Sequence, residues 1–112
     1  MEKQIITINF ENIKNAMDVM QSIDKAFGFN EAENINWNAI YDDLRSLNTQ
    51  SPVVFRDMPK AVHVTLKNPY KVKENSQEDY DTMIEVMAEA TDKKQRSDGI
   101  DFTFEISNDY EQ

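Results

Sequence analysis

Apolar and polar residues alternate in three short segments of the chain, which is the pattern of β-strands with one buried face. The segments are residues 4–10, 61–66 and 100–107. The last one is the most regular, because its apolar residues share one face: Ile100, Phe102, Phe104 and Ile106. We therefore expect three strands, each covered on one side.

Between these strands, apolar residues recur every three or four positions, which indicates amphipathic helices. Asn15 is expected to cap the first helix, with Asp18 completing a capping box, and Gly28 is expected to end it. Ser76 and Asp79 repeat the capping pattern before the longest helix. The apolar stripe of that helix comprises Tyr80, Met83, Ile84, Met87 and Ala90. Its last turns are expected to hold cations that suit the helix dipole, namely Lys93, Lys94 and Arg96.

Another helix is predicted over residues 36–47, with Asn36 as its cap. Its apolar face comprises Trp37, Ile40, Leu44 and Leu47. A second face is polar, acidic and aromatic, and comprises Asn38, Tyr41, Asp42 and Arg45. Tyr41 lies outside the apolar stripe, so we expect it to be at least partly exposed, with packing in the core as the alternative. Such a face suits the binding of a basic partner.

The remaining segments complete the predicted topology. Residues 68–75 are expected to form a loop, and residues 52–60 either a short helix or an edge strand. The order is then β-α-α-(α)-β-α-β, an α/β fold with a small three-stranded parallel sheet and three to four helices. Alternation in every strand predicts helices mainly on one face, in two layers. The length fits a single domain over residues 1–112.

The charge of the chain narrows the class of partner. Asp and Glu number 21 against 12 Lys and Arg, so the net charge is −9. Phosphate binding needs clustered Lys and Arg, so the composition argues against direct contact with nucleic acid. The charge serves either solubility or attraction of a basic partner. No apolar run reaches the roughly 20 residues of a membrane span, so we expect a cytoplasmic protein with no membrane contact.

The residues required by common enzyme mechanisms are missing. Gly28 and Gly99 lie in different turns, so no glycine-rich phosphate loop exists, and the chain has no cysteine. His63 is the only histidine and points outward from its strand, so it is interpreted as structural or solvated. We therefore expect no catalytic residue, no metal and no cofactor.

The longest helix also carries a line of acids at Asp81, Glu85 and Glu89. They are either a solvated helix face or the extension of an anionic surface that begins at Asp42. An acid–base pair of Asp42 with Asp81 or Glu85 is disfavoured, because no apolar pocket or substrate-positioning group accompanies it. The methionines at helical spacing are assigned to the core: Met17, Met20, Met83 and Met87.

The element order and the segment N-x-N-A-I-Y-D-D-L at residues 36–44 resemble the barstar family of ribonuclease inhibitors. The likeness runs over residues 5–107 and is strongest over residues 34–47. In that family, the second helix and the loop before it plug the active site of the ribonuclease, and the acids of the inhibitor replace the phosphates of RNA.

The resemblance implies roles for particular residues. Asp42 matches the main acidic anchor of the family, which meets an Arg and His cluster of the enzyme. Tyr41 stands where the best-known member has Trp, Asn36 matches the Asn at the helix start, and Asp81 replaces a Glu of the last helix. The implied partner surface comprises Asn34, Asn36, Asn38, Tyr41, Asp42, Arg45 and Asp81.

Three positions depart from the family pattern. Asn38 replaces an interface Asp, Ala32 replaces an interface Tyr, and Asn34 replaces a Gly whose backbone comes close to the enzyme. Residues 48–60 also align poorly. These departures favour a nuclease toxin other than barnase, or a relative that has lost inhibition.

We therefore expect a stoichiometric inhibitor, an immunity protein, of a secreted basic ribonuclease or nuclease toxin, and a monomer when free. The alternatives are an acidic binding or regulatory module for a basic partner that is not a nuclease, and a small enzyme.

Overall fold

The centre of the computed structural model is a three-stranded parallel sheet with the order β1-β2-β3. The strands are β1 (Lys3–Asn9), β2 (Ala61–Lys67) and β3 (Asp101–Ser107), and they pair in register along their whole length. All three confirm the predicted strands to within one residue at each end. The structure describes residues 3–29, 31, 34–47 and 59–109.

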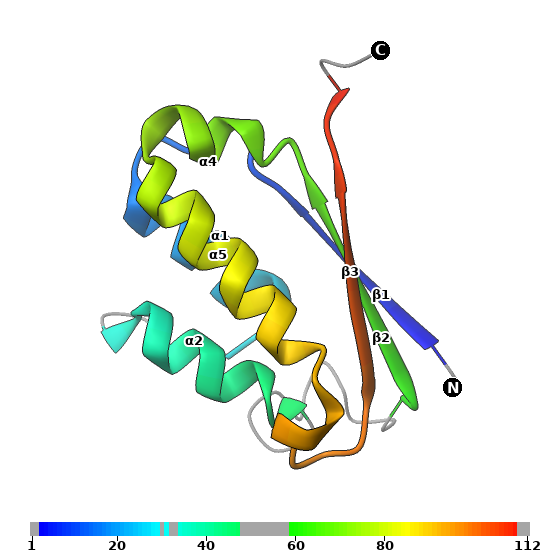
Figure 1. Cartoon of the computed structure of the whole chain (residues 1–112). Coiled ribbons are helices and arrows are strands. Elements are labelled where there is room, and N and C mark those ends of the chain that lie inside the picture. The colour runs from blue at the N-terminus through cyan, green and yellow to red at the C-terminus, as the bar shows by residue number, and fades with distance from the viewer. Residues whose placement is uncertain (1–2, 30, 32–33, 48–58, 110–112) are drawn as a thin grey trace.

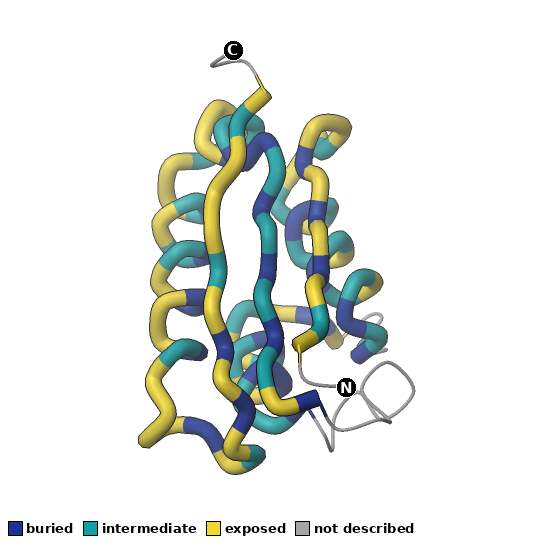
Figure 2. Tube along the Cα trace, turned by 90° about the vertical axis from the view of Figure 1, so that its right-hand side faces the viewer, coloured by how far each residue is buried: buried dark blue, intermediate teal, exposed yellow. Residues whose placement is uncertain are grey.

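The helices lie together on one side of the sheet (Figure 1). Among the described residues, no helix lies in front of the opposite face of the sheet (Figure 2). Two layers are therefore present, as the alternation of the strands predicted. The helices are α1 (Ala16–Phe27), α2 (Trp37–Leu44), α4 (Tyr70–Asn75), α5 (Gln77–Ala90) and the 3-10 turn η2 (Lys93–Gln95).

Burial along the central strand shows why one face needs helices. Val62, Val64 and Leu66 are fully buried, whereas His63 and Thr65 between them stay partly exposed on the outer face. The inner side chains meet the apolar stripes of the helices. The largest fully buried side chains of this core are Phe10, Phe27, Phe102, Ile23, Ile40, Leu44, Leu47, Leu66, Met83, Met87 and Val19.

Both predicted helix caps are present. The Asp18 amide donates to Asn15 Oδ1 over 2.9 Å, and the Asp79 amide donates to Ser76 Oγ over 3.2 Å. The carboxylate of Asp18 accepts from the amide of Lys14 over 2.8 Å, one residue before the cap. The carboxylate of Asp79 instead accepts a hydrogen bond from the indole N–H of Trp37. Each cap removes unsatisfied amides from a helix start.

The loop expected at residues 68–75 is wrong, because most of this segment forms α4. Asn68 takes a left-handed turn with φ 57°, and Pro69 with φ −68° begins the helix, where its missing N–H costs nothing. Val72 is buried and anchors the turn. The described order is therefore β-α-α-β-α-α-β, with the additional helix after β2. For residues 52–60 the sequence predicted either a short helix or an edge strand. Most of this segment lies outside the described residues.

Two helices end earlier than predicted. Regular helix α2 stops at Leu44, although Leu47 remains buried as its position in the stripe predicted. Helix α5 stops at Ala90, and η2 follows as a separate turn. Arg96 therefore does not lie in the last turns of α5 and is buried instead.

Two apolar assignments also differ. Met17 was assigned to the core but is 42% exposed, because it lies on the outer side of α1. Ile106 keeps the inward phase of β3 but is exposed, near the carboxyl end of this edge strand. Over the described ranges, we find no helix whose length and apolar character would let it cross a membrane.

Candidate functional site

Helix α2 is held at its first turn by asparagine side chains. Asn36 Oδ1 accepts from the amide of Ala39 over 2.8 Å, and Asn36 Nδ2 donates to the carbonyl of Asn34 over 3.2 Å. The Asn34 amide in turn donates to the carbonyl of Glu31 over 3.0 Å. Hydrogen bonds therefore link Glu31 and Asn34 to the start of α2. Asn34 and Asn36, both predicted partner residues, are exposed there.

The two faces predicted for α2 are present. Ile40 and Leu44 are completely buried, whereas Asn38 and Asp42 are exposed. Trp37 is half-buried, and its Nε1 donates to Asp79 Oδ1 over 3.3 Å. This bond fixes the start of α2 to the start of α5. A rigid layer of two helices thus presents the polar face of α2.

The side chain of Asp42, the acid of that face, is 72% exposed. Arg45 NH1 lies 3.8 Å from Asp42 Oδ1, and its guanidinium carbon lies 5.2 Å from the centre of the Tyr41 ring. Arg45 Nε also donates to the carbonyl of Gln95 over 2.8 Å. Arg45 is therefore held mainly by Tyr41 and Gln95. An exposed ion pair contributes only about 0–1 kcal/mol, so Asp42 can exchange it for another cation.

Tyr41 is half-buried, so the expectation of partial exposure is confirmed, and its buried part packs against the core, as the alternative predicted. Its ring lines a hollow of about 250 Å³ together with Glu89, Asp92 and Gln95. Tyr41 thus lies between the exposed acid of α2 and acids of the α5–η2 region.

The acids of α5 lie on the same helical layer. Asp81, Glu85 and Glu89 are all exposed. Asp81 Oδ1 accepts from Gln77 Nε2 over 2.9 Å, within its own helix. Asp81 therefore lies on the helix that packs against α2, and it is hydrogen-bonded to Gln77. Exposure of these acids agrees with both interpretations, a solvated helix face and an extension of the anionic surface.

A buried ion pair, which the sequence did not predict, fastens the other end of α2. Arg96 Nε and NH2 donate to the two carboxylate oxygens of Asp98 over 3.0 and 2.8 Å. Asp98 Oδ2 also accepts from the amide of Leu47 over 2.9 Å, just beyond α2. A sequence pattern could have indicated this pair: Arg96 and Asp98 carry opposite charges two residues apart, in the turn before the buried residue Ile100.

Asp43 is a further residue whose place in the structure the sequence analysis did not predict. It is 5% exposed, and its Oδ2 has no hydrogen-bond donor in the described part of the chain. Burial, as the largest cause, together with the Glu31 carboxyl group and the negative charges of Glu31, Asp24 and Asp42, raises the pKa of Asp43 to about 8. The helical spacing could have predicted its burial, because residue 43 follows the buried Ile40 by three positions and lies on the same side of α2.

Other polar sites fit structural roles. On the outer face of the sheet, His63 Nδ1 lies 2.7 Å from Thr103 Oγ1, and His63 Nε2 lies 3.2 Å from Glu105 Oε1. The described residues hold no group of three or more His, Cys, Asp or Glu side chains that could bind a metal ion.

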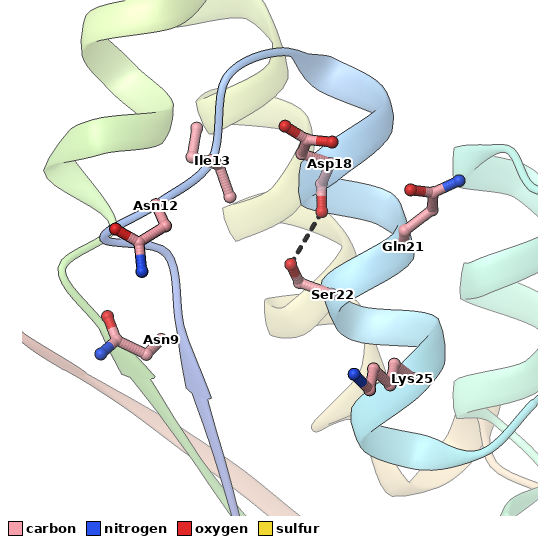
Figure 3. A pocket seen from close by; sticks show the side chains of 7 residues that line it. All are labelled: Asn9, Asn12, Ile13, Asp18, Gln21, Ser22 and Lys25. Carbon is pink, nitrogen blue, oxygen red and sulfur yellow. Dashed lines mark hydrogen bonds between the residues drawn. The ribbon is translucent and has the colours of Figure 1, made fainter.

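A further hollow of about 300 Å³ lies between the end of β1 and α1 (Figure 3). Within it, Ser22 Oγ donates to the carbonyl of Asp18 over 2.8 Å, and the Asp18 carboxylate already serves the helix cap. The Ser22 hydroxyl and the Asp18 carboxylate in this hollow therefore serve α1 itself. The lining residues are Asn9, Asn12, Ile13, Asp18, Gln21, Ser22 and Lys25.

Comparison with known proteins agrees with the order and packing of the elements. The family described as Barstar (barnase inhibitor) matches residues 3–107 of the chain. No curated protein matches it significantly. Because the family match covers nearly the whole chain, including every described strand and helix, the protein belongs to the barstar family of ribonuclease inhibitors, whose members are not enzymes.

Proposed function

We propose that the protein is a stoichiometric inhibitor, an immunity protein, of a secreted ribonuclease toxin, and that α2 with the preceding loop plugs the basic active site. The observation that carries this proposal is Asp42. Its carboxylate is 72% exposed and leads the polar face of a helix that is fixed at both ends. Membership of the barstar family supports the ribonuclease as the class of target and the cytoplasm as the place of action.

The proposed mechanism is imitation of an RNA phosphate. A ribonuclease active site gathers cations to bind phosphate, and a carboxylate offers them the same charge and bidentate geometry. Asp42 would enter that site, and the enzyme cations would replace Arg45 as its partner. The inhibitor presents no phosphodiester bond, so the enzyme is occupied without turnover.

The neighbouring residues would complete the surface. Tyr41 gives a ring with a polar tip beside the acid, a common anchor at interfaces. Asn34, Asn36 and Asn38 are exposed amides that suit a polar rim. Asp81 would add a second negative charge from α5.

The net charge of −9 would speed the encounter with a basic enzyme. Charge steering raises association rates by about 10 to 1,000-fold and weakens as salt is added. Barnase and barstar are themselves the reference case for this effect, so the magnitude is carried over and is not worked out from this chain.

The test is inhibition of a basic secreted ribonuclease encoded beside this protein's gene, measured by titration. We expect activity to fall to zero at one equivalent. Replacing Asp42→Asn keeps the shape and removes the charge, and should weaken binding by about 3 kcal/mol, or about 150-fold. The matched control Asp101→Asn removes an exposed acid from β3 and should change affinity less than about twofold. Inhibition that survives Asp42→Asn unchanged would reject the mechanism.

One observation favours a second candidate, an acidic module for a basic partner that is not a nuclease. The exposed face of α2 carries Asn38 beside Asp42, so its negative charge is lower than an Asp at both positions would give. Capture experiments with the wild-type protein and Asp42→Asn discriminate between the candidates. A partner without nuclease activity that is lost with Asp42→Asn would favour the second one.

A further inference from the structure

The two edges of the sheet differ in how well they are protected. Strand β1 forms one edge and β3 the other. Edge strands of natural proteins are usually guarded by charged side chains, proline or a bulge, because their free backbone groups can pair with another chain. Strand β3 carries the exposed acids Asp101 and Glu105, whereas Lys3 is the only charged residue of β1, at its first position. Strand β1 also presents Ile5, which is 62% exposed. It is therefore the less protected edge.

The backbone of β1 presents hydrogen-bonding groups along this edge. Just after the strand, the amide of Phe10 donates to the carbonyl of Lys67 over 2.9 Å, toward β2. Successive residues of a strand direct their backbone groups to opposite sides, so Ile8 also faces β2. Ile5 and Thr7 direct their N–H and C=O groups the other way, out of the sheet. Within the described part of the chain, these outward groups meet no hydrogen-bonding partner.

The open edge of β1 lies beside a groove that α1 forms with it (Figure 3). Two hollows, of about 300 and about 390 Å³, share the residues Asn9, Ser22 and Lys25 and are therefore continuous. The second hollow extends along β1 to Thr7. We call these joined hollows the β1–α1 groove. A groove beside a free strand edge has the shape and the hydrogen-bonding groups to receive an extended chain as an added strand.

The charge that remains available in this groove is positive. The Asp18 carboxylate is already bound by the amide of Lys14, and the Ser22 hydroxyl by a carbonyl of α1. Lys25 extends from α1 toward the gap beside β1 (Figure 3). It is exposed, and its ammonium group has no ion-pair or hydrogen-bond partner among the described residues. An acidic side chain on the bound segment would therefore complement the groove.

A second copy of the protein does not offer that acid. The acid must lie on the inner side of the added strand, as Ile8 does, because Ile8 lines the groove. Strand β1 of a second copy contains no acid. In β3 the inner side is that of the buried Phe102, so Asp101 and Glu105 point to the outer side. The groove therefore suits a segment of a different protein.

We propose that the β1–α1 groove binds an extended segment of a partner protein as a fourth strand beside β1, and that Lys25 selects an acidic residue in it. Adjacent residues of a strand point to opposite faces. The acid thus faces the groove, while apolar neighbours lie beside Ile5 on the outer face. The residues of the groove are distinct from the partner surface proposed on α2, so this inference does not depend on ribonuclease inhibition.

The experiment adds a blocked peptide of the sequence Ser-Val-Glu-Val-Thr-Val-Ser to the full-length protein and follows amide hydrogen exchange by NMR. An antiparallel arrangement places the glutamate beside Ile8 and valines beside Thr7 and Ile5. At a peptide concentration about ten times Kd, exchange at the Ile5 and Thr7 amides should slow by about tenfold. The Ile8 amide already faces β2 and should not change. Unchanged exchange at Ile5 and Thr7 with millimolar peptide would overturn the proposal.

Modified peptides separate backbone pairing from charge. N-methylation of the central valine removes a donor that faces β1 and should abolish the protection. N-methylation of the glutamate, whose N–H faces away from β1, should leave the protection in place. Replacing the glutamate by glutamine should weaken binding by about three- to fivefold, as expected for an exposed ion pair. Binding that tolerates N-methylation of the central valine would overturn strand addition, and equal affinity of the glutamate and glutamine peptides would overturn the selection of an acid.

Two matched variants test the role of Lys25. Lys25→Glu should weaken binding of the glutamate peptide by about tenfold and favour a peptide with lysine in its place. Lys14→Glu makes the same change of charge at an exposed residue that does not line the groove, and should alter affinity less than about twofold. Equal losses in the two variants would reject Lys25 as the selecting residue. Protection of Ile5 and Thr7 that rises with protein concentration, without peptide, would assign the edge to a second copy and overturn the proposal.

Discussion

The buried pair of Arg96 and Asp98 offers the clearest quantitative test of what fixes α2. Both side chains are completely shielded from solvent. Asp98 accepts from the guanidinium of Arg96 and from the amides of Leu47 and Ile100. Arg96 NH1 also donates to the carbonyl of Ala90 over 2.9 Å. One carboxylate therefore links the chain after α2, the end of α5 and the start of β3.

Replacing Asp98→Ala leaves Arg96 charged and buried without its counterion, and leaves the amides of Leu47 and Ile100 without their acceptor. Breaking a buried pair on one side costs about 3–5 kcal/mol, so we expect a loss near 4 kcal/mol. This is a large share of the roughly 5–15 kcal/mol that stabilises a domain of this kind.

The measurement is urea unfolding followed by circular dichroism at neutral pH. Asp101→Ala, which removes an exposed acid three residues away, should change the free energy of unfolding by less than about 0.5 kcal/mol. The double variant Arg96→Met with Asp98→Ala should recover at least about 1 kcal/mol, because the unpaired buried charge is gone. A loss below about 1 kcal/mol for Asp98→Ala would refute the assignment of the pair as an anchor.

Three further predictions concern stability. Asn36→Ala removes the acceptor of the Ala39 amide and should lower the free energy of unfolding by about 1 kcal/mol in urea titration, whereas an unchanged midpoint would contradict the cap. Leu44→Ala opens a cavity in the core and should cost about 3 kcal/mol by the same assay; a cost below about 1 would show that α2 does not pack as described. For Asp43, the stabilising effect of the protonated form is complete below about pH 3.8 and is lost as pH rises through about 8. The free energy of unfolding of Asp43→Asn should not show this decline with pH. Parallel pH profiles for the variant and the wild type would contradict the role given to Asp43.

Much of the fold was predictable because each strand alternates on one face only. The alternation predicted the strands, their parallel order through helical crossovers, and the single helical layer. The caps at Asn15, Asn36 and Ser76 were equally readable, since a capping side chain acts on amides within three residues. Local signals sufficed wherever the structure depends on near neighbours.

The errors arise where distant residues decide the structure. Helix α4 is six residues long and buries only Val72, so its periodic signal is too weak to overcome a proline and a run of charges. The early end of α2 depends on Ser97, which lies 52 residues further along the chain and whose amide donates to the carbonyl of Arg45 over 3.1 Å. No pattern within residues 36–47 contains that information.

The candidate site shows the same division. The positions of Asn38 and Asp42 on α2 predicted that both are exposed. The position of the adjacent acid, Asp43, directs it away from Asp42 and into the protein. The burial of Asp43 and the partial burial of Tyr41 depend instead on how α2 packs against the rest of the fold. Ala32, named from the family resemblance, lies outside the described residues.

The most direct test of the charge-mimicry account is a crystal structure of the protein bound to its target ribonuclease. The account predicts that the Asp42 carboxylate lies within hydrogen-bond distance, about 2.7–3.2 Å, of the cationic side chains that bind RNA phosphate. A complex in which Asp42 still faces solvent, or in which the enzyme's phosphate site stays open, would contradict it.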